Sequence, residues 1–326
     1  MSTLPAMFVA SLFVSVVVTP TAPGAAAAAS PSLAAPSEPF RIVGGTETEE
    51  GEFDAVAAIE IDGFGQCTGT LIDPWLVLTA AHCFDASRDD QSVHVYFGAN
   101  GTSIAASGYG IHPNYCTSCA EQFGSDYGER YDFAYVVLSE RYDPADGLLL
   151  PVTSQQEWND TMQIGSTVRL VGYGQTQPLG GSSSPGRSKH EVTTIIEKLS
   201  PYGLEFYAGQ DEVTRDTCNG DSGGPVIVRT REGQLRLAGV TSRGSDPCGD
   251  GGWYGVAFAA LPWIDHHTHT ELLPVGCELG DCLDLVPPDD SASRCSVGNH
   301  PDDTAWLKLG LGLLLGLRRR RPSRVR

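Results

Sequence analysis

The sequence predicts an all-β protein made of short strands and tight turns. Its 326 residues include 38 glycines and 21 prolines, and its β-branched apolar residues come in short runs rather than at helical spacing. A chain of this length exceeds one average domain and can bury a sizeable core. We therefore expect β-barrels or a β-sandwich, with little helix.

The expected strands begin at residue 56 and are separated by Gly, Pro and Asp turns. The segments with strand-like sequence are residues 56–61, 69–78, 93–97, 133–138, 167–173, 226–229 and 235–240. Pro262-Trp263-Ile264 opens the one segment in which we expect a modest helix, ending near residue 273.

The chain is strongly acidic. Its formal net charge at pH 7 is −19, and because Lys308 and a cluster of arginines lie in the C-terminal tail, the body is more acidic still. Such a body repels nucleic acid and anionic membranes and suits cationic partners. Most of the acidic residues are expected to form a solvated surface.

The cysteines and the N-terminus indicate an exported protein, either secreted or attached to the cell surface. Nine cysteines are many for a cytosolic enzyme. Residues 1–29 combine an apolar run with an alanine tract that offers A-x-A cleavage positions, and we interpret them as a signal peptide. A membrane anchor is the alternative, which the shortness of the apolar run disfavours. Residues 30–41 form a Pro/Ala/Ser-rich pro-segment that ends at Arg41.

One stretch, from Cys218 to Pro225, has the features of a covalent acyl-transfer site. Ser222 lies among glycines and directly follows Asp221. The small neighbours leave the hydroxyl uncrowded and the nearby backbone N–H groups bare. We expect Ser222 to be a nucleophile, which needs a general base because a serine hydroxyl is weakly nucleophilic.

His82 is the candidate base. It follows an apolar, small-residue stretch and precedes Cys83, and a bridge from Cys83 to Cys67 would hold the imidazole rigidly. The imidazole in turn needs a buried carboxylate to fix its tautomer and to favour the imidazolium. Asp132 heads an apolar run and is expected at the mouth of a core strand, whereas its rival Asp126 lies in a polar loop.

The order of these residues resembles the chymotrypsin/trypsin family of serine endopeptidases. The motifs that carry the likeness are Thr79-Ala80-Ala81-His82-Cys83, Asp132-Phe133-Ala134 and Gly220-Asp221-Ser222-Gly223-Gly224-Pro225. The likeness covers residues 42–273. It implies two six-stranded antiparallel β-barrels with a boundary near residues 150–165, a short C-terminal helix, and a site in the cleft between the barrels.

The resemblance also implies a role for each residue. Ser222 corresponds to the nucleophile, His82 to the general base and later acid, and Asp132 to the orienting carboxylate. The backbone N–H groups of Gly220 and Ser222 correspond to the oxyanion hole. The family needs no cofactor and no metal for this chemistry.

A zymogen is implied as well, because Arg41-Ile42-Val43-Gly44-Gly45 resembles the family's activation junction. Cleavage after Arg41 would free the amino group of Ile42, which in this family pairs with the aspartate before the nucleophile, here Asp221. A buried carboxylate requires a buried cation, and that cation exists only after the cut.

The expected specificity pocket has Asp216 at its floor, six positions before the nucleophile, where trypsin-like members carry an aspartate. A buried carboxylate there selects Arg or Lys before the scissile bond through a charge-assisted pair. Gly244 and Gly252 align with the glycines that keep the pocket mouth open, and Tyr254 with the aromatic residue behind it. Because Arg41 would suit this pocket, we hypothesise self-activation.

Two further positions follow from the alignment. Ser242 matches the serine that supports the buried aspartate. The next residue is Arg243, where the family usually has a tryptophan. A cation at this place either favours acidic residues upstream in the substrate or pairs with Asp246.

Eight of the nine cysteines are expected to form disulfides. The expected pairs are Cys67–Cys83, Cys218–Cys248, Cys116–Cys119 and Cys277–Cys282. The first two match family disulfides. For Cys116 and Cys119, half of a zinc site with His112 is the alternative. The His-rich residues 265–269 are interpreted as a solvated helix face rather than a metal site.

The tail resembles a C-terminal sorting segment of the MYXO-CTERM type found in myxobacterial surface proteins. It contains Ser293-Arg294-Cys295-Ser296, a polar spacer, a short Leu/Gly run and several arginines. Residues 274–304 would then be a Cys-containing linker and residues 305–326 the sorting segment, with anchoring or processing at Cys295. The alternative is an amphipathic tail that contacts the membrane, since the apolar run is shorter than the ~20 residues of a spanning helix.

Taken together, these features predict a secreted serine endopeptidase made as a zymogen. It would hydrolyse peptide bonds after Arg or Lys through an acyl-enzyme, and its partners would be protein and peptide substrates and protein inhibitors. One alternative is a catalytically idle surface binding module of the same fold, which the intact motifs disfavour. The other is a protease for non-basic substrates, which Asp216 opposes.

Overall fold

The computed structural model describes most of the chain between residues 42 and 285. The described residues are 42, 44–63, 65–88, 90–98, 101–115, 131–174, 188–209, 215–244, 248–274, 277, 282, 283 and 285. Several sequence predictions lie outside them: the signal peptide, the pro-segment with Arg41, Asp126, Asp246, the Cys116–Cys119 pair, and the tail with Cys295.

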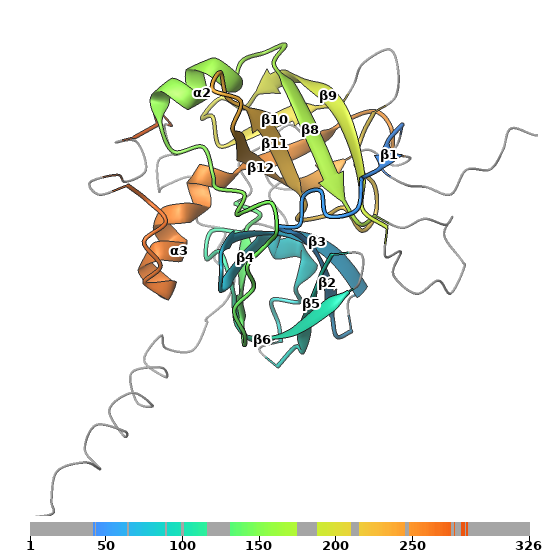
Figure 1. Ribbon diagram of the computed structural model, residues 1–326. Coiled ribbons are helices and arrows are strands. Elements are labelled where there is room, and N and C mark those ends of the chain that lie inside the picture. Colours follow the sequence, from blue (N-terminus) through green and yellow to red (C-terminus); the bar gives the residue numbers. More distant parts are fainter. Residues whose placement is uncertain are drawn as a thin grey trace, which may run out of the picture. The chain divides into compact units, whose positions relative to one another are not determined.

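Six antiparallel strands close the first barrel, drawn in blue to green in Figure 1. In their order around the barrel they are β2 (Val56–Ile61), β3 (Gly65–Asp73), β4 (Leu76–Thr79), β7 (Ala134–Leu138), β6 (Thr102–Ile111) and β5 (Val93–Phe97). β4 is buried along its whole length, and β2 is buried except at Glu60. These runs of Val, Ile, Leu and Ala therefore form the barrel core.

The second barrel is also a closed ring of six antiparallel strands. In order they are β8 (Thr167–Gly172), β9 (His190–Leu199), β10 (Glu205–Ala208), β13 (Gly252–Val256), β12 (Leu235–Gly244) and β11 (Pro225–Arg229), and β11 pairs with β8 to close the ring. The short strand β1 (Thr46–Glu47) pairs with β9. Phe206 and Tyr254 are fully buried and stack with ring centroids 5.5 Å apart.

The prediction of two six-stranded antiparallel barrels with a short C-terminal helix is confirmed, although the strand bounds differ. The expected strand 69–78 is two strands, because Pro74 cannot donate to a ladder and the amide of Trp75 turns back to the Asp73 carboxylate at 2.9 Å. β6, β9, β10 and β13 were not predicted. β9 does alternate buried and exposed residues over part of its length, which is a strand signal.

The helices are few and short. α3 (Leu261–Thr268) ends earlier than the predicted residue 273, because His269 adopts a left-handed φ of 55° and the Asp265 carboxylate accepts the amides of Leu272 and Leu273. α2 (Gln155–Thr161) was not predicted. Among the described residues, no helix combines the length and the apolar character needed to cross a membrane.

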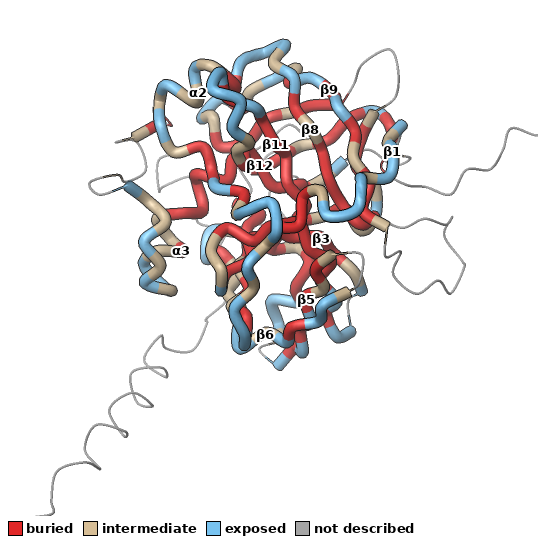
Figure 2. Tube along the Cα trace, in the orientation of Figure 1, coloured by how far each residue is buried: buried red, intermediate tan, exposed pale blue. Residues whose placement is uncertain are grey.

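The two barrels meet along β2, β3 and β4 on one side and β8, β11 and β12 on the other. Figure 2 shows that the buried segments continue from one barrel into the other at this junction. Hydrogen bonds cross it: the Tyr173 hydroxyl donates to the Val56 carbonyl at 3.2 Å, and the Gln66 amide donates to the Tyr173 carbonyl at 2.9 Å. This junction positions the site.

Candidate active site

His82 lies on a 3₁₀ turn, η1 (Ala81–Cys83), that directly follows β4. The turn is anchored by the Cys67–Cys83 disulfide, whose Cα atoms are 6.3 Å apart and whose cysteines are both fully buried. The side chain of His82 is 26% exposed. The backbone at His82 is therefore held in place, while its imidazole ring is accessible to solvent.

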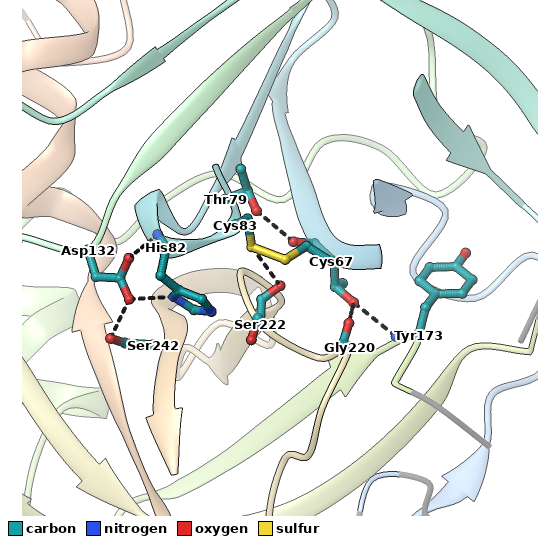
Figure 3. Close-up of a disulfide and its surroundings, with 10 residues drawn as sticks. Cys67, Thr79, His82, Cys83, Asp132, Tyr173, Gly220, Ser222 and Ser242 are labelled. Carbon is teal, nitrogen blue, oxygen red and sulfur yellow. Dashed lines mark hydrogen bonds and ion pairs between the residues drawn. A yellow bond between two sulfur atoms is a disulfide. The ribbon is translucent and has the colours of Figure 1, made fainter. Parts of the chain in front are cut away.

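Asp132 lies just before β7 and receives three hydrogen bonds (Figure 3). Its Oδ1 accepts the backbone N–H of His82 at 2.9 Å, and its Oδ2 accepts from His82 Nδ1 at 2.7 Å and from the Ser242 hydroxyl at 2.6 Å. Asp132 is 4% exposed. The carboxylate is thus buried, and hydrogen bonds from protein groups replace the water it has lost.

These contacts decide the charge of Asp132. Burial alone would raise the pKa of Asp132, but the charge of His82 and the hydrogen bonds from His82 and Ser242 outweigh it and hold the pKa below its ordinary value. An ionised carboxylate at Nδ1 makes that nitrogen the proton-bearing one and favours the imidazolium. In the neutral ring the other nitrogen, Nε2, then carries the lone pair and can accept a proton.

Ser222 lies on the far side of the imidazole. Figure 3 shows the His82 ring between Asp132 and Ser222, with its second nitrogen turned toward Ser222. The carbonyl of Ser222 accepts the backbone N–H of Thr68 at 2.8 Å, which ties this segment of the second barrel to the first. The structure therefore brings together the three residues that the sequence nominated from separate segments.

Glycines shape the segment around Ser222. Gly220 and Gly223 have φ values of 95° and 80°, in the left-handed region that favours glycine. A side chain at Gly223 would also collide with the Thr79 hydroxyl and the Thr68 carbonyl. Both positions therefore require glycine.

The backbone N–H groups of this segment fall into two sets. Those of Asp221, Gly223 and Gly224 are bonded to carbonyl oxygens at 2.8 to 3.0 Å. Those of Gly220 and Ser222 make no hydrogen bond within the described part of the chain. Two unpaired N–H donors beside a serine hydroxyl are suited to binding an oxyanion.

Asp216 is fully buried below three glycines. Its carboxylate accepts the Thr217 N–H at 2.7 Å, the Tyr254 hydroxyl at 3.2 Å and the Gly249 N–H at 3.3 Å. Burial raises the pKa of Asp216, and these hydrogen bonds oppose the rise. Among the described residues no cation pairs with it, so the site suits an incoming cationic side chain.

The glycines leave space above this carboxylate. A Cβ atom added at Gly244, Gly252 or Gly209 would lie 3.6, 3.4 or 3.5 Å from an Asp216 oxygen. Gly244 and Gly252 were predicted and are paired across β12 and β13. Gly209 was not predicted, because its φ of 113° and its place beside Asp216 depend on the folded structure.

Residues 42–264 match the family model described as Trypsin. The chain belongs to the trypsin family. It is 29% identical over 264 residues to Melanization protease 1 of Drosophila melanogaster, which covers 70% of this chain and 65% of that protein. It is 31% identical over 236 residues to Glandular kallikrein-10 of Rattus norvegicus, a match that covers 67% of this chain and 84% of that protein. It is 28% identical over 258 residues to Spermosin of Halocynthia roretzi, a match that covers 69% of this chain and 62% of that protein. The chain thus spans less than two thirds of the length of two of these three relatives.

Asp221, the aspartate before the family's serine, is fully buried without a cation among the described residues. It is held by the N–H groups of Gly174 at 2.8 Å and Cys218 at 3.0 Å. Burial raises the pKa of Asp221 to about 7, against the lowering effect of the two amides, and the charge of Asp216 adds to the rise. Ile42, the residue after the predicted cleavage point, is 1% exposed.

Arg243 does not point freely into solvent. Its guanidinium forms a two-pronged pair with Glu205, at 2.9 and 2.7 Å, and lies 5.3 Å from the ring centre of Trp253. Glu205 is 2% exposed. One of the two sequence interpretations paired Arg243 with Asp246, which lies outside the described residues. Glu205 was not anticipated, because it lies 38 residues away on β10 and has no local signal.

The other described cysteines form disulfides, and the other described histidines form no metal-binding group. Disulfides join Cys218 to Cys248 and Cys277 to Cys282, with Cα separations of 5.5 and 5.3 Å. No group of three His, Cys, Asp or Glu side chains able to hold a metal occurs among the described residues. His112 is buried, and burial together with the charge of His267 lowers the pKa of His112 to about 3.

Proposed function

We propose that this chain is a secreted serine endopeptidase, made as a zymogen, that cleaves after Arg or Lys. The observation that carries the proposal is the hydrogen-bonded series from Ser242 through Asp132 to His82, with Ser222 on the opposite side of the imidazole from Asp132. A structural histidine needs no buried ionised carboxylate on one side and a partly exposed serine on the other. A general base needs both.

In the proposed reaction the Ser222 oxygen attacks the scissile carbonyl carbon while His82 takes the hydroxyl proton. Asp132 stabilises the imidazolium that results, and the N–H groups of Gly220 and Ser222 bind the oxyanion of the tetrahedral intermediate. The intermediate collapses to an acyl-enzyme as the C–N bond breaks and His82 gives its proton to the leaving amine. Water, activated by His82, then attacks the ester and releases the acid and the Ser222 hydroxyl.

Specificity is assigned to Asp216. A buried carboxylate that has hydrogen-bond donors but no cation gains most from a substrate guanidinium or ammonium group. The glycines above it admit a long side chain. Arg243 is held by Glu205 and so is not expected to neutralise acidic residues of the substrate.

Activation is assigned to the amino group of Ile42. The buried Asp221 of the uncut chain shares two amide donors and has a raised pKa. A new α-amino group, released by cleavage after Arg41, would supply the missing charge and ionise the carboxylate. Since Arg41 fits a pocket that selects basic residues, the cut is proposed to be made by another copy of the same enzyme.

The test uses chain cleaved after Arg41, with Ile42 confirmed as the new N-terminus. Matched peptides that end in Arg, Lys, Phe or Leu before a chromogenic leaving group are incubated with this chain and with the Ser222→Ala variant. We expect turnover of the Arg and Lys peptides alone and none by the variant. Preference for Phe would overturn the pocket assignment, and absence of all turnover would favour a binding module.

Self-activation has its own control. In a preparation free of other proteases, the unsubstituted chain should be cut after Arg41, whereas the Ser222→Ala chain should stay intact. A Ser222→Ala chain that is cut at the same rate would show that another protease does the work.

A further inference from the structure

Thr68 connects the two barrels at the nucleophile loop. It lies on β3, next to the disulfide-bonded Cys67, and is fully buried. Its backbone N–H donates to the carbonyl of Ser222 at 2.8 Å, and its hydroxyl donates to the carbonyl of Gly220 at 2.9 Å. The same hydroxyl accepts the N–H of Tyr173 at 3.1 Å. One residue of the first barrel thus binds three backbone groups of the second.

The two carbonyls bound by Thr68 belong to the two residues whose N–H groups are unpaired. Gly220 and Ser222 therefore turn their carbonyl oxygens toward the first barrel, and their N–H groups have no partner within the described residues. Glycine offers little conformational resistance of its own at a φ of 95°. Hydrogen bonds therefore fix the orientation of this segment, and those from Thr68 hold it from outside.

Packing alone does not account for the hydroxyl. Both of its hydrogen bonds join residues more than 100 positions apart, 152 to Gly220 and 105 to Tyr173. Valine has the same shape and would fill the same space, but it would remove the bonds to the partly buried Gly220 carbonyl and to the buried N–H of Tyr173. The Thr68 hydroxyl satisfies both at once.

We propose that Thr68 is a positioning residue that aligns the two oxyanion-binding N–H groups by holding the carbonyls of Gly220 and Ser222 at the same time. The inference rests on the proposed function, since it concerns the transition state of that reaction. Thr68 itself does not touch the substrate. It acts through Gly220 and Ser222, by holding the carbonyl that follows each of the two N–H groups along the backbone.

The test compares two inhibitors of the activated chain. A peptide aldehyde ending in Arg forms a tetrahedral adduct with its oxygen at the N–H donors, whereas benzamidine binds only above Asp216. In Thr68→Val we expect kcat and aldehyde affinity to fall together by roughly tenfold or more, because one oxyanion donor is worth about 10²–10³ in rate and here the donors are misaligned rather than removed. Benzamidine affinity and KM should stay within about threefold.

Two further variants separate positioning from general destabilisation. Thr68→Ser keeps the hydroxyl and should restore kcat and aldehyde affinity. Thr241→Val is the matched control, because the Thr241 hydroxyl donates to the carbonyl of Gly224 at 3.1 Å in the same loop. It should lower the melting temperature without changing the ratio of the two inhibitor affinities. If Thr68→Val does not fold, Thr68→Ala carries the same prediction.

The outcomes are distinct. Unchanged kcat and aldehyde affinity in a folded Thr68→Val or Thr68→Ala chain overturns the inference. So does an equal loss of both inhibitors in these variants and in Thr241→Val. Failure of the unsubstituted chain to turn over the Arg peptide would instead refute the proposed function.

Discussion

Replacing Gly244 by alanine tests the pocket with a single methyl group. The Cβ atom would lie 3.6 Å from Asp216 Oδ2 and 3.6 Å from the Gly251 carbonyl, which are ordinary van der Waals contacts. Its backbone φ is not in the left-handed region. Folding should therefore be almost unaffected, while the methyl occupies the space through which a basic side chain would reach the carboxylate.

The size of the effect follows from the pair that is prevented. Losing one partner of a buried, hydrogen-bonded charge pair costs about 2 to 5 kcal/mol, which corresponds to a fall in kcat/KM of roughly 30-fold to several thousand-fold. Gly252→Ala should lose stability as well, because its Cβ would lie 2.9 Å from the Arg243 carbonyl.

The assay is kcat/KM for an Arg peptide, with the melting temperature of each variant measured beside it. Gly108→Ala is the control, since a methyl on that strand residue would meet nothing within 4 Å. It should leave both quantities unchanged. If Gly244→Ala kept kcat/KM within about threefold of the unsubstituted enzyme, the substrate side chain would not approach Asp216 past this glycine, and the pocket reasoning would be refuted.

Three other substitutions or conditions probe the charges. Between about pH 4 and 7 the folded, uncut chain holds a proton on Asp221 that the unfolded chain has released. Its free energy of unfolding should therefore fall by up to roughly 4 kcal/mol as pH rises through this range. If the free energy of unfolding of Asp221→Asn fell with pH as steeply as that of the unsubstituted chain, this reasoning would be contradicted. Ser242→Ala removes a 2.6 Å bond to the ionised Asp132, worth about 1.5 to 3 kcal/mol, and should lower kcat/KM roughly 10- to 150-fold; a change below threefold would count against the role given to this serine. Glu205→Gln removes the carboxylate that pairs with the largely buried Arg243 and should lower the free energy of unfolding in urea by about 3 to 5 kcal/mol. An unchanged midpoint would show that the pair contributes nothing.

What the sequence could predict depended on local patterns. His82, Asp132 and Ser222 each lie in a short motif, and the reasoning that a serine needs a base and the base a carboxylate linked them. β2 and β5 have their predicted bounds because each is a compact apolar run ended by turns.

Features that arise when distant segments meet were not predictable. Thr68 and Glu205 have no local motif, and their partners are separated from them by 152 and 38 positions. The helix α2 did have a signal, since Ser154 caps the N–H of Glu157 in a Ser-x-x-Glu pattern. With only seven residues, that helix lacks the apolar periodicity that identifies longer ones.

The division of the site between the barrels bears on how the protein is made. His82 and Asp132 come from the first barrel, and Ser222 and Ser242 from the second. Neither barrel holds a complete set of reacting groups. For the proposed protease, the site is therefore assembled only when both barrels have folded and docked, so a nascent chain would lack it until synthesis of the second barrel is complete.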